Sequence, residues 1–267
     1  MIDTHCHLPL LAGKNQISNH EYHKLVTSYI NRALNNNITT IINIGTTVQE
    51  SIDCIELAHL FKECFAVIGI HPTEINHTWK NEYQQIEKLL KEKEKNKIVG
   101  IGECGIDLFH KKESLVIQKD AFKGQIELAL KYDLALVIHS RNAPDETLEV
   151  LELYHKDIQH LVFHCFSYDE SFAQQAYTWG YMLGIGGTIT YPKNDILRRV
   201  IKNAHADAFV LETDAPFLPI QSMRGKQNAP EHIADIASFI ATIREVTQDD
   251  IDHITTQNAK KLFKLKR

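Results

Sequence analysis

The sequence has 267 residues, 43% of them hydrophobic and 24% charged, a composition typical of a globular protein with a sizeable core. This length is long for one ordinary domain but fits a (β/α)₈ barrel, which needs about 250 residues. The net charge of −5 argues against a sequence-specific DNA-binding protein that holds a long polyanion on a positive surface, but not against a nucleic acid held locally.

Short β-rich segments alternate with amphipathic helical segments along the whole chain, and we count eight such cycles. Strands are predicted at residues 2–7, 39–44, 65–70, 98–103, 135–139, 161–164, 181–185 and 208–212. The helical segments between them include residues 21–36, 51–61, 83–93 and 117–132. Two further helices, at residues 230–246 and 248–263, are predicted to end the chain.

Strands separated by helices of this length predict βαβ units and a parallel sheet. Because eight such units close into a barrel, the sequence favours a single (β/α)₈ TIM barrel over residues 1–267 and disfavours an open doubly wound sheet. No Gly-x-Gly-x-x-Gly motif follows the first strand, which removes the usual sign of dinucleotide binding. The predicted fold class is therefore α/β, with one domain.

The active site of a (β/α)₈ barrel lies at the C-terminal ends of its strands. The first predicted strand ends in His5 and His7, and this spacing places both imidazoles on one strand face. A lone interior histidine is usually a hydrogen-bonded core residue, whereas two at this spacing can chelate one ion. The fourth strand ends in Glu103, whose buried carboxylate needs either a metal ion or a salt bridge to Lys or Arg.

Three more predicted strands end in ionisable side chains: His139 ends the fifth, His164 the sixth, and Glu212-Thr213-Asp214 the eighth. Five strand ends thus supply four histidines and two carboxylates, which core packing does not readily explain. Six ligands exceed the needs of one tetrahedral ion, so we expect two divalent ions that share a carboxylate and activate water. Imidazole and carboxylate ligands suit Zn²⁺ or Mn²⁺, while all-oxygen sites suit Mg²⁺; the sequence does not choose among the three.

The five cysteines are irregularly spaced and contain no CxxC pair, so they predict no disulfide framework. We interpret them as small core hydrophobes, and the remaining histidines, His110 among them, as surface residues. The first residues carry no recognisable secretory leader, and no apolar run approaches the ~18 residues that cross a bilayer. These observations predict a cytoplasmic protein without membrane association or an obligate protein partner; they do not indicate an oligomeric state.

Seven segments carry ordered motifs: Asp3-Thr4-His5-Cys6-His7, Gly69-Ile70-His71-Pro72, Gly102-Glu103-Cys104-Gly105-Ile106-Asp107, Ile138-His139-Ser140-Arg141-Asn142-Ala143, His164-Cys165-Phe166-Ser167, Glu212-Thr213-Asp214-Ala215-Pro216 and Gly225-Lys226-Gln227-Asn228. Together they resemble the TatD-type metal-dependent hydrolases, a family of amidohydrolase-like barrels, over essentially the whole length. Two positions depart from the family pattern. Cys104 stands where isoleucine is usual, and Tyr168 where glycine is usual.

The resemblance implies a role for each ligand. One ion would be bound by His5, His7 and Asp214, and Glu103 would bridge to a second ion bound by His139 and His164. Asp214 would also orient or deprotonate the attacking water, which makes Asp214 and Glu103 the candidate catalytic residues. His71 and Arg141, beside the ligands, would bind phosphate oxygens. The alternatives are a loop-bracing hydrogen bond for His71 and a salt bridge for Arg141.

Characterised members of the family are mostly nucleases that act on phosphodiesters, often from the 3′ end. The resemblance therefore implies a deoxyribonuclease of 3′–5′ exonuclease type, with a nucleic-acid end or nucleotide as substrate. The net charge of −5 favours binding of single-stranded ends over binding along a long duplex. One alternative is hydrolysis at a carbonyl centre, as in an amidase, lactonase or aminoacyl-tRNA deacylase. A second is an inactive barrel that serves as a binding module.

Overall fold

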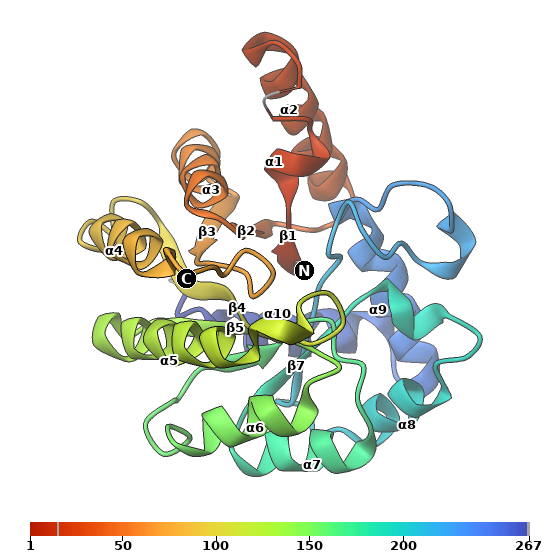
Figure 1. Ribbon diagram of the computed structural model, residues 1–267. Helices are drawn as coiled ribbons and strands as arrows, with labels where there is room; N and C mark the ends of the chain where they lie inside the picture. Colours follow the sequence, from red (N-terminus) through yellow and green to blue (C-terminus); the bar gives the residue numbers. More distant parts are fainter. Residues whose placement is uncertain (15, 266–267) are drawn as a thin grey trace.

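The computed structural model describes residues 1–14 and 16–265, which form a ring of strands surrounded by helices (Figure 1). The strands are β1 (Ile2–Cys6), β2 (Thr40–Ile44), β3 (Cys64–Ile68), β4 (Ile98–Asp107), β5 (Ala135–Arg141), β6 (Leu161–Phe163), β7 (Met182–Ile185) and β8 (Phe209–Leu211). Each strand pairs in parallel with the next, in sequence order from β1 to β8. A parallel bridge between Cys6 and Ala215 joins the first strand to the segment after the last. The result is the predicted (β/α)₈ barrel, nearly closed.

The α-helices cover the outside of the sheet. They are α1 (Leu8–Leu11), α2 (Asn19–Asn35), α3 (Val48–Leu60), α4 (Trp79–Leu90), α5 (Leu115–Tyr132), α6 (Pro144–Glu152), α7 (Glu170–Thr178), α8 (Asp195–Asn203), α9 (Ile233–Arg244) and α10 (Gln248–Leu262). Four 3₁₀ turns accompany them among the described residues: η1 (Lys112–Ser114), η2 (Gly187–Thr190), η3 (Gln221–Met223) and η4 (Pro230–His232). None of the helices in the described part of the chain has the length and apolarity needed to cross a membrane.

Helix α2 shows how the sequence sets these elements. Ser18 and Glu21 form a capping box, in which each side chain accepts a hydrogen bond from the other residue's backbone N–H, so the first turn is satisfied. Its buried side chains Tyr22, Val26 and Ile30 recur every four residues. This spacing places them on one helix face, which therefore packs against the barrel.

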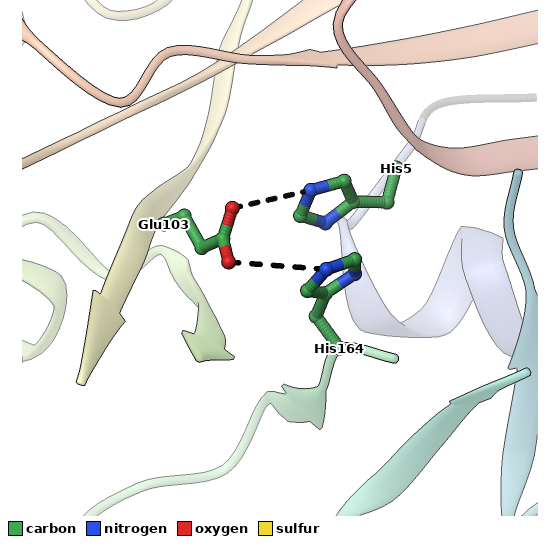
Figure 2. A group of neighbouring side chains, drawn as sticks. All are labelled: His5, Glu103 and His164. Carbon is green, nitrogen blue, oxygen red and sulfur yellow. Dashed lines mark ion pairs between the residues drawn. The ribbon is translucent and has the colours of Figure 1, made fainter. Parts of the chain in front are cut away.

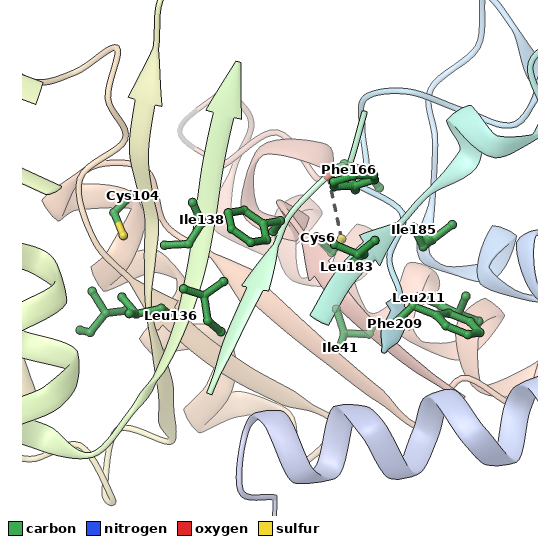
Figure 3. Packing of buried hydrophobic residues seen from close by; sticks show 14 of the residues in the cluster. Cys6, Ile41, Cys104, Leu136, Ile138, Phe166, Leu183, Ile185, Phe209 and Leu211 are labelled. Atoms are coloured by element: carbon green, nitrogen blue, oxygen red, sulfur yellow. Dashed lines mark hydrogen bonds between the residues drawn. The ribbon is translucent and has the colours of Figure 1, made fainter. Parts of the chain in front are cut away.

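Alternating strand residues divide the apolar core into two layers. Leu136 and Ile138 of β5 belong to the larger cluster, which lies between strands and helices (Figure 3). Val137, between them, belongs to a second cluster, in which Leu262 and Phe263 at the end of α10 also take part. This second cluster fills the N-terminal end of the barrel interior, and α10 lies across that end (Figure 1).

All eight predicted strands overlap observed ones, but some ends differ where the site forms. Strand β1 ends at Cys6, so the prediction that His5 and His7 share one strand face is wrong in detail. Pro9 lies in the first turn of α1 and His7 is its N-cap; proline favours this position and starts the helix there. Strand β4 continues to Asp107 because it stays paired with β5 up to Arg141.

Candidate metal centre

The predicted ligands gather at the C-terminal end of the barrel. His5 lies on β1 and Glu103 on β4, whereas His164 directly follows β6 and Asp214 follows β8; all four are buried. Figure 2 shows the two carboxylate oxygens of Glu103 facing His5 and His164, at 3.4 and 3.8 Å from their Nε2 atoms. The rings of the two histidines are stacked, with their centroids 3.4 Å apart. One carboxylate therefore spans the middle of the site.

His5, His7 and Asp214 form a compact group on one side of this carboxylate. The Nε2 atoms of the two histidines are 3.2 Å apart, and they lie 3.7 and 3.4 Å from Oδ1 of Asp214. An ion with bonds of about 2.1 Å separates its tetrahedral ligands by about 3.4 Å. The spacing of these three atoms therefore fits a bound divalent ion, although His7 lies beyond the strand.

Glu103, His139 and His71 form a second group around the other carboxylate oxygen. Oε1 of Glu103 lies 2.6 Å from Nδ1 of His139 and 3.5 Å from Nε2 of His71. The predicted set had placed His164 beside His139 on the second ion. In the structure His164 belongs to a further group with His5 and Glu103, and its Nε2 lies 3.8 Å from the same Glu103 oxygen that faces His139. His71 thus lies among side chains that could hold a metal ion.

Contacts behind the site orient two of the imidazoles. Nδ1 of His7 lies 3.0 Å from the carbonyl oxygen of Ile44. Because a carbonyl can only accept, Nδ1 donates and Nε2 presents its lone pair to the site. Nδ1 of His164 similarly lies 3.0 Å from Oε1 of Glu212. Metal-binding histidines typically have such a partner on the second ring nitrogen, so these residues fit the proposed chemistry.

The charges of the site balance one another. Burial alone would raise the pKa of the Glu103 carboxyl, but the surrounding imidazoles, His164 foremost, hold that pKa well below its usual range. Burial lowers the pKa of His164, yet the carboxylates around it, Glu212 foremost, outweigh burial and raise the pKa to about 10. The His164 imidazolium and the carboxylates around it thus stabilise each other's charge, and a divalent ion can take the place of such a proton.

Except for His5, the members of both ligand groups line a cavity of about 780 Å³, and both predicted phosphate-binding residues line it too. The Arg141 guanidinium lies 4.2 Å from the centre of the Phe109 ring. It forms no ion pair within residues 1–14 and 16–265, so the alternative salt bridge is not formed there. For His71 the alternative hydrogen bond is present, since Oγ1 of Thr73 lies 2.7 Å from its Nδ1.

Comparison with known proteins identifies the family. The sequence model of the family described as TatD related DNase matches residues 2–264. The chain belongs to the TatD family. It is 29% identical to the uncharacterized metal-dependent hydrolase YabD of Bacillus subtilis, over 99% of both chains. It is 30% identical to YjjV, an uncharacterized metal-dependent hydrolase of Escherichia coli, over 98% of this chain and 97% of YjjV.

The solved structure of Escherichia coli YjjV, a TatD homolog, has the same architecture. It superposes with a TM-score of 0.88 at 28% identity, covering 100% of this chain and 98% of that one. The present protein is therefore a metal-dependent hydrolase of the TatD family with a single-domain (β/α)₈ barrel.

Two residues of the site, Asp107 and Glu212, were not assigned roles from the sequence. Asp107 ends β4, and its Oδ2 lies 3.1 Å from Nε2 of His139 and 3.0 Å from Nδ1 of His110. Asp107 thus orients the His139 imidazole. His110 is an exposed residue, as expected from the sequence, and it also lines the cavity. Period two from Glu103 along an extended β4 would have placed Asp107 on the same face.

Glu212 supports the site from behind. Besides facing His164, its Oε1 accepts a hydrogen bond of 2.6 Å from the backbone N–H of Cys165. Gly184 on β7 leaves the room that this carboxylate occupies, because a Cβ there would overlap it. Four of the cysteines are buried as predicted, but Cys165 is only partly buried and lines the cavity. Its place in the loop after β6 explains this difference.

The two departures from the family pattern have different surroundings. Cys104 is buried in the apolar core on the outer side of β4 (Figure 3), so it does not alter the ligands. The Tyr168 hydroxyl lies 2.9 Å from Oγ of Ser140 and accepts a hydrogen bond from the backbone N–H of Ala143. Tyr168 therefore ties the loop after β6 to the loop after β5.

Proposed function

We propose that this TatD protein is a two-metal-dependent phosphodiesterase, a deoxyribonuclease that trims single-stranded DNA ends in the 3′–5′ direction. The observation that carries the proposal is the two ligand groups on either side of Glu103, with Arg141 lining the same cavity. The family's description as DNase-related supports the same choice. We further propose that it acts in the cytoplasm.

Each ligand has a role in the proposed hydrolysis. His5, His7 and Asp214 would hold one ion, Glu103 would bridge, and His139 would hold the second together with His164 and His71. Such ions supply activation of water and neutralise the charge that develops on the phosphate oxygens. Asp214, buried in the first group, would orient the attacking water and accept its proton.

The cavity offers few positive charges to the phosphates of the substrate. Among the cavity-lining residues of the described chain, Arg141 is the only lysine or arginine, and its planar fork suits two phosphate oxygens. Lys226, in the Asn-containing motif after β8, is not among the lining residues. Because few phosphates would be neutralised, the logarithm of affinity should fall with the logarithm of salt concentration at a slope of only about −1 to −3.

An end-dependence assay tests the proposal. The metal-loaded protein is given an end-labelled single strand and a covalently closed circle of the same sequence. We expect stepwise shortening of the linear strand and slow cutting of the circle. Rapid cleavage of the circle, or a salt slope steeper than about −6, would contradict the proposed mode. A panel of carboxylic esters and lactones, assayed in parallel, decides between phosphodiester and carbonyl substrates.

Metal content tests the ligand assignment separately. Elemental analysis of protein refilled with Zn²⁺, Mn²⁺ or Mg²⁺ should find close to two ions per chain. A chelator should abolish hydrolysis and lower the melting temperature, since the ions bind only the folded chain. Full activity after exhaustive chelation would refute the metal mechanism as a whole.

A further inference from the structure

Three large apolar side chains are exposed on one side of the cavity mouth. Leu10, Phe217 and Leu218, here called the apolar lip, are 42%, 49% and 36% exposed and line the same cavity as the ligand groups. Exposed apolar side chains that gather at a pocket commonly mark a binding surface. The lip lies beside the first ligand group, because the Phe217 ring centre is 6.0 Å from that of His7.

Leu10 lies on α1, and the loop that carries Phe217 and Leu218 is held in place by hydrogen bonds. The Phe217 N–H donates a 2.7 Å hydrogen bond to the carbonyl of Asp214, whose own N–H donates to His5. Asn228 donates from Nδ2 to the Thr213 carbonyl at 2.6 Å. Leu218 has a φ of +45°, a backbone region that residues with a side chain seldom adopt. Phe217 and Leu218 are therefore displayed by a fixed backbone beside a metal ligand.

The other side of the mouth has the opposite character. Arg141 lies there with its guanidinium stacked on Phe109, and His139, two residues earlier on β5, belongs to the second ligand group. The mouth thus has an apolar side next to one ligand group and a cationic side next to the other. A ligand that fits both sides carries a flat apolar ring at one end and an anionic chain at the other.

We infer that the apolar lip is the subsite for the nucleobase of the terminal nucleotide, with Phe217 as the stacking residue. This inference rests on the proposed function, since a nucleotide combines a stacking ring with a phosphate. Bases stack on aromatic side chains whatever their identity, and the phosphate side of the nucleotide is turned toward Arg141. Because the side chains of Leu10, Phe217 and Leu218 carry no hydrogen-bonding groups, the subsite accepts all four bases with similar affinity.

The test removes the ring from the protein and the base from the substrate. Two end-labelled single strands differ only at the 3′-terminal residue, which is either thymidine or a tetrahydrofuran abasic analogue. Phe217→Ala should raise KM for the thymidine end about tenfold and leave KM for the abasic end unchanged, with kcat little altered. Phe217→Trp should retain the preference for the thymidine end. The matched control is Leu60→Ala, which truncates an exposed leucine at the end of α3.

The outcomes separate the inference from the proposed function. An equal loss on both strands, or no loss on either, would overturn the base subsite while leaving phosphodiester cleavage in place. A strong preference of the wild type for one base over the other three would also overturn it. If the metal-loaded wild type cleaves neither strand, the proposed function fails, and the inference fails with it.

Discussion

The two ends of the barrel interior are built from the same strands and have opposite chemistry. At the N-terminal end, Ile2 and Val210 pack with Leu262 of α10 in an entirely apolar cluster. At the C-terminal end, His5 and Asp214 are also buried but ionisable. On β1 the change occurs within three residues, from Ile2 to His5, where the register of the strand shifts.

This contrast assigns stability and activity to different ends. Burial of apolar surface stabilises the fold by about 25 cal/mol per Å², and the cluster under α10 contributes only through such burial. Buried ionisable groups cost desolvation that must be offset by partners, and here their partners are one another. Substitutions at the apolar end should therefore lower stability, and those at the ligand end should lower activity.

Asp214→Asn should give the largest separation of the two effects. The residue has a φ of +57°, a conformation that asparagine tolerates well, so the loop should keep its shape. Loss of the charge and of a proton acceptor should lower kcat by ~10²–10⁴-fold. Steady-state kinetics and thermal unfolding of the same preparation measure both effects. Normal kcat with a much lower melting temperature would show that Asp214 contributes to stability and not to activity.

Leu262→Ala probes the apolar end. The side chain is buried in the cluster beneath the barrel, so truncation should lower the free energy of unfolding by about 2–5 kcal/mol. Denaturant unfolding of wild type and variant measures this change. Below the unfolding transition, kcat should stay within a factor of about two of the wild-type value. A large fall in kcat without loss of stability would show that the two ends are coupled.

Glu212→Gln tests how far the ligand end extends outward from the ions. The carboxylate faces Nδ1 of His164 and binds the N–H of Cys165, and the amide keeps its size. Removal of such a supporting charge should weaken metal affinity by about 10- to 100-fold. Competition with a chelator of known affinity measures the change. Unaltered affinity with lowered stability would make Glu212 a purely structural residue.

The sequence predicted much of the ligand end because strand ends are local features. Each ligand follows an apolar run in a βα cycle, and all parallel strands of a barrel end on one side. His5, Glu103, His164 and Asp214 could therefore be expected to meet before any coordinates were known. The TatD resemblance added which of them would share an ion, a point that periodicity alone could not supply.

The features of the site that the sequence did not predict depend on contacts between segments that lie far apart in the sequence. His71 follows β3 and His139 lies on β5, so their 3.2 Å approach depends on how the loop after β3 reaches past β4. The stacking of His164 on His5 likewise joins two residues that are far apart in the sequence. The apolar lip could not be predicted either, because exposed leucine and phenylalanine side chains look like core residues in a sequence.

Arg141→Ala should have the smallest effect. It tests whether residues outside the two ligand groups contribute to substrate binding. The side chain is exposed, stacks on Phe109 and lies outside both ligand groups. If its guanidinium binds phosphate equally in the ground and transition states, its loss should raise KM about tenfold and leave kcat unchanged. The control is Arg141→Lys, which keeps the charge but not the planar fork and should recover part of the affinity. A normal KM with a lowered melting temperature would instead mean that Arg141 stabilises the fold by stacking on Phe109. His139 would then be the outermost functional residue on β5.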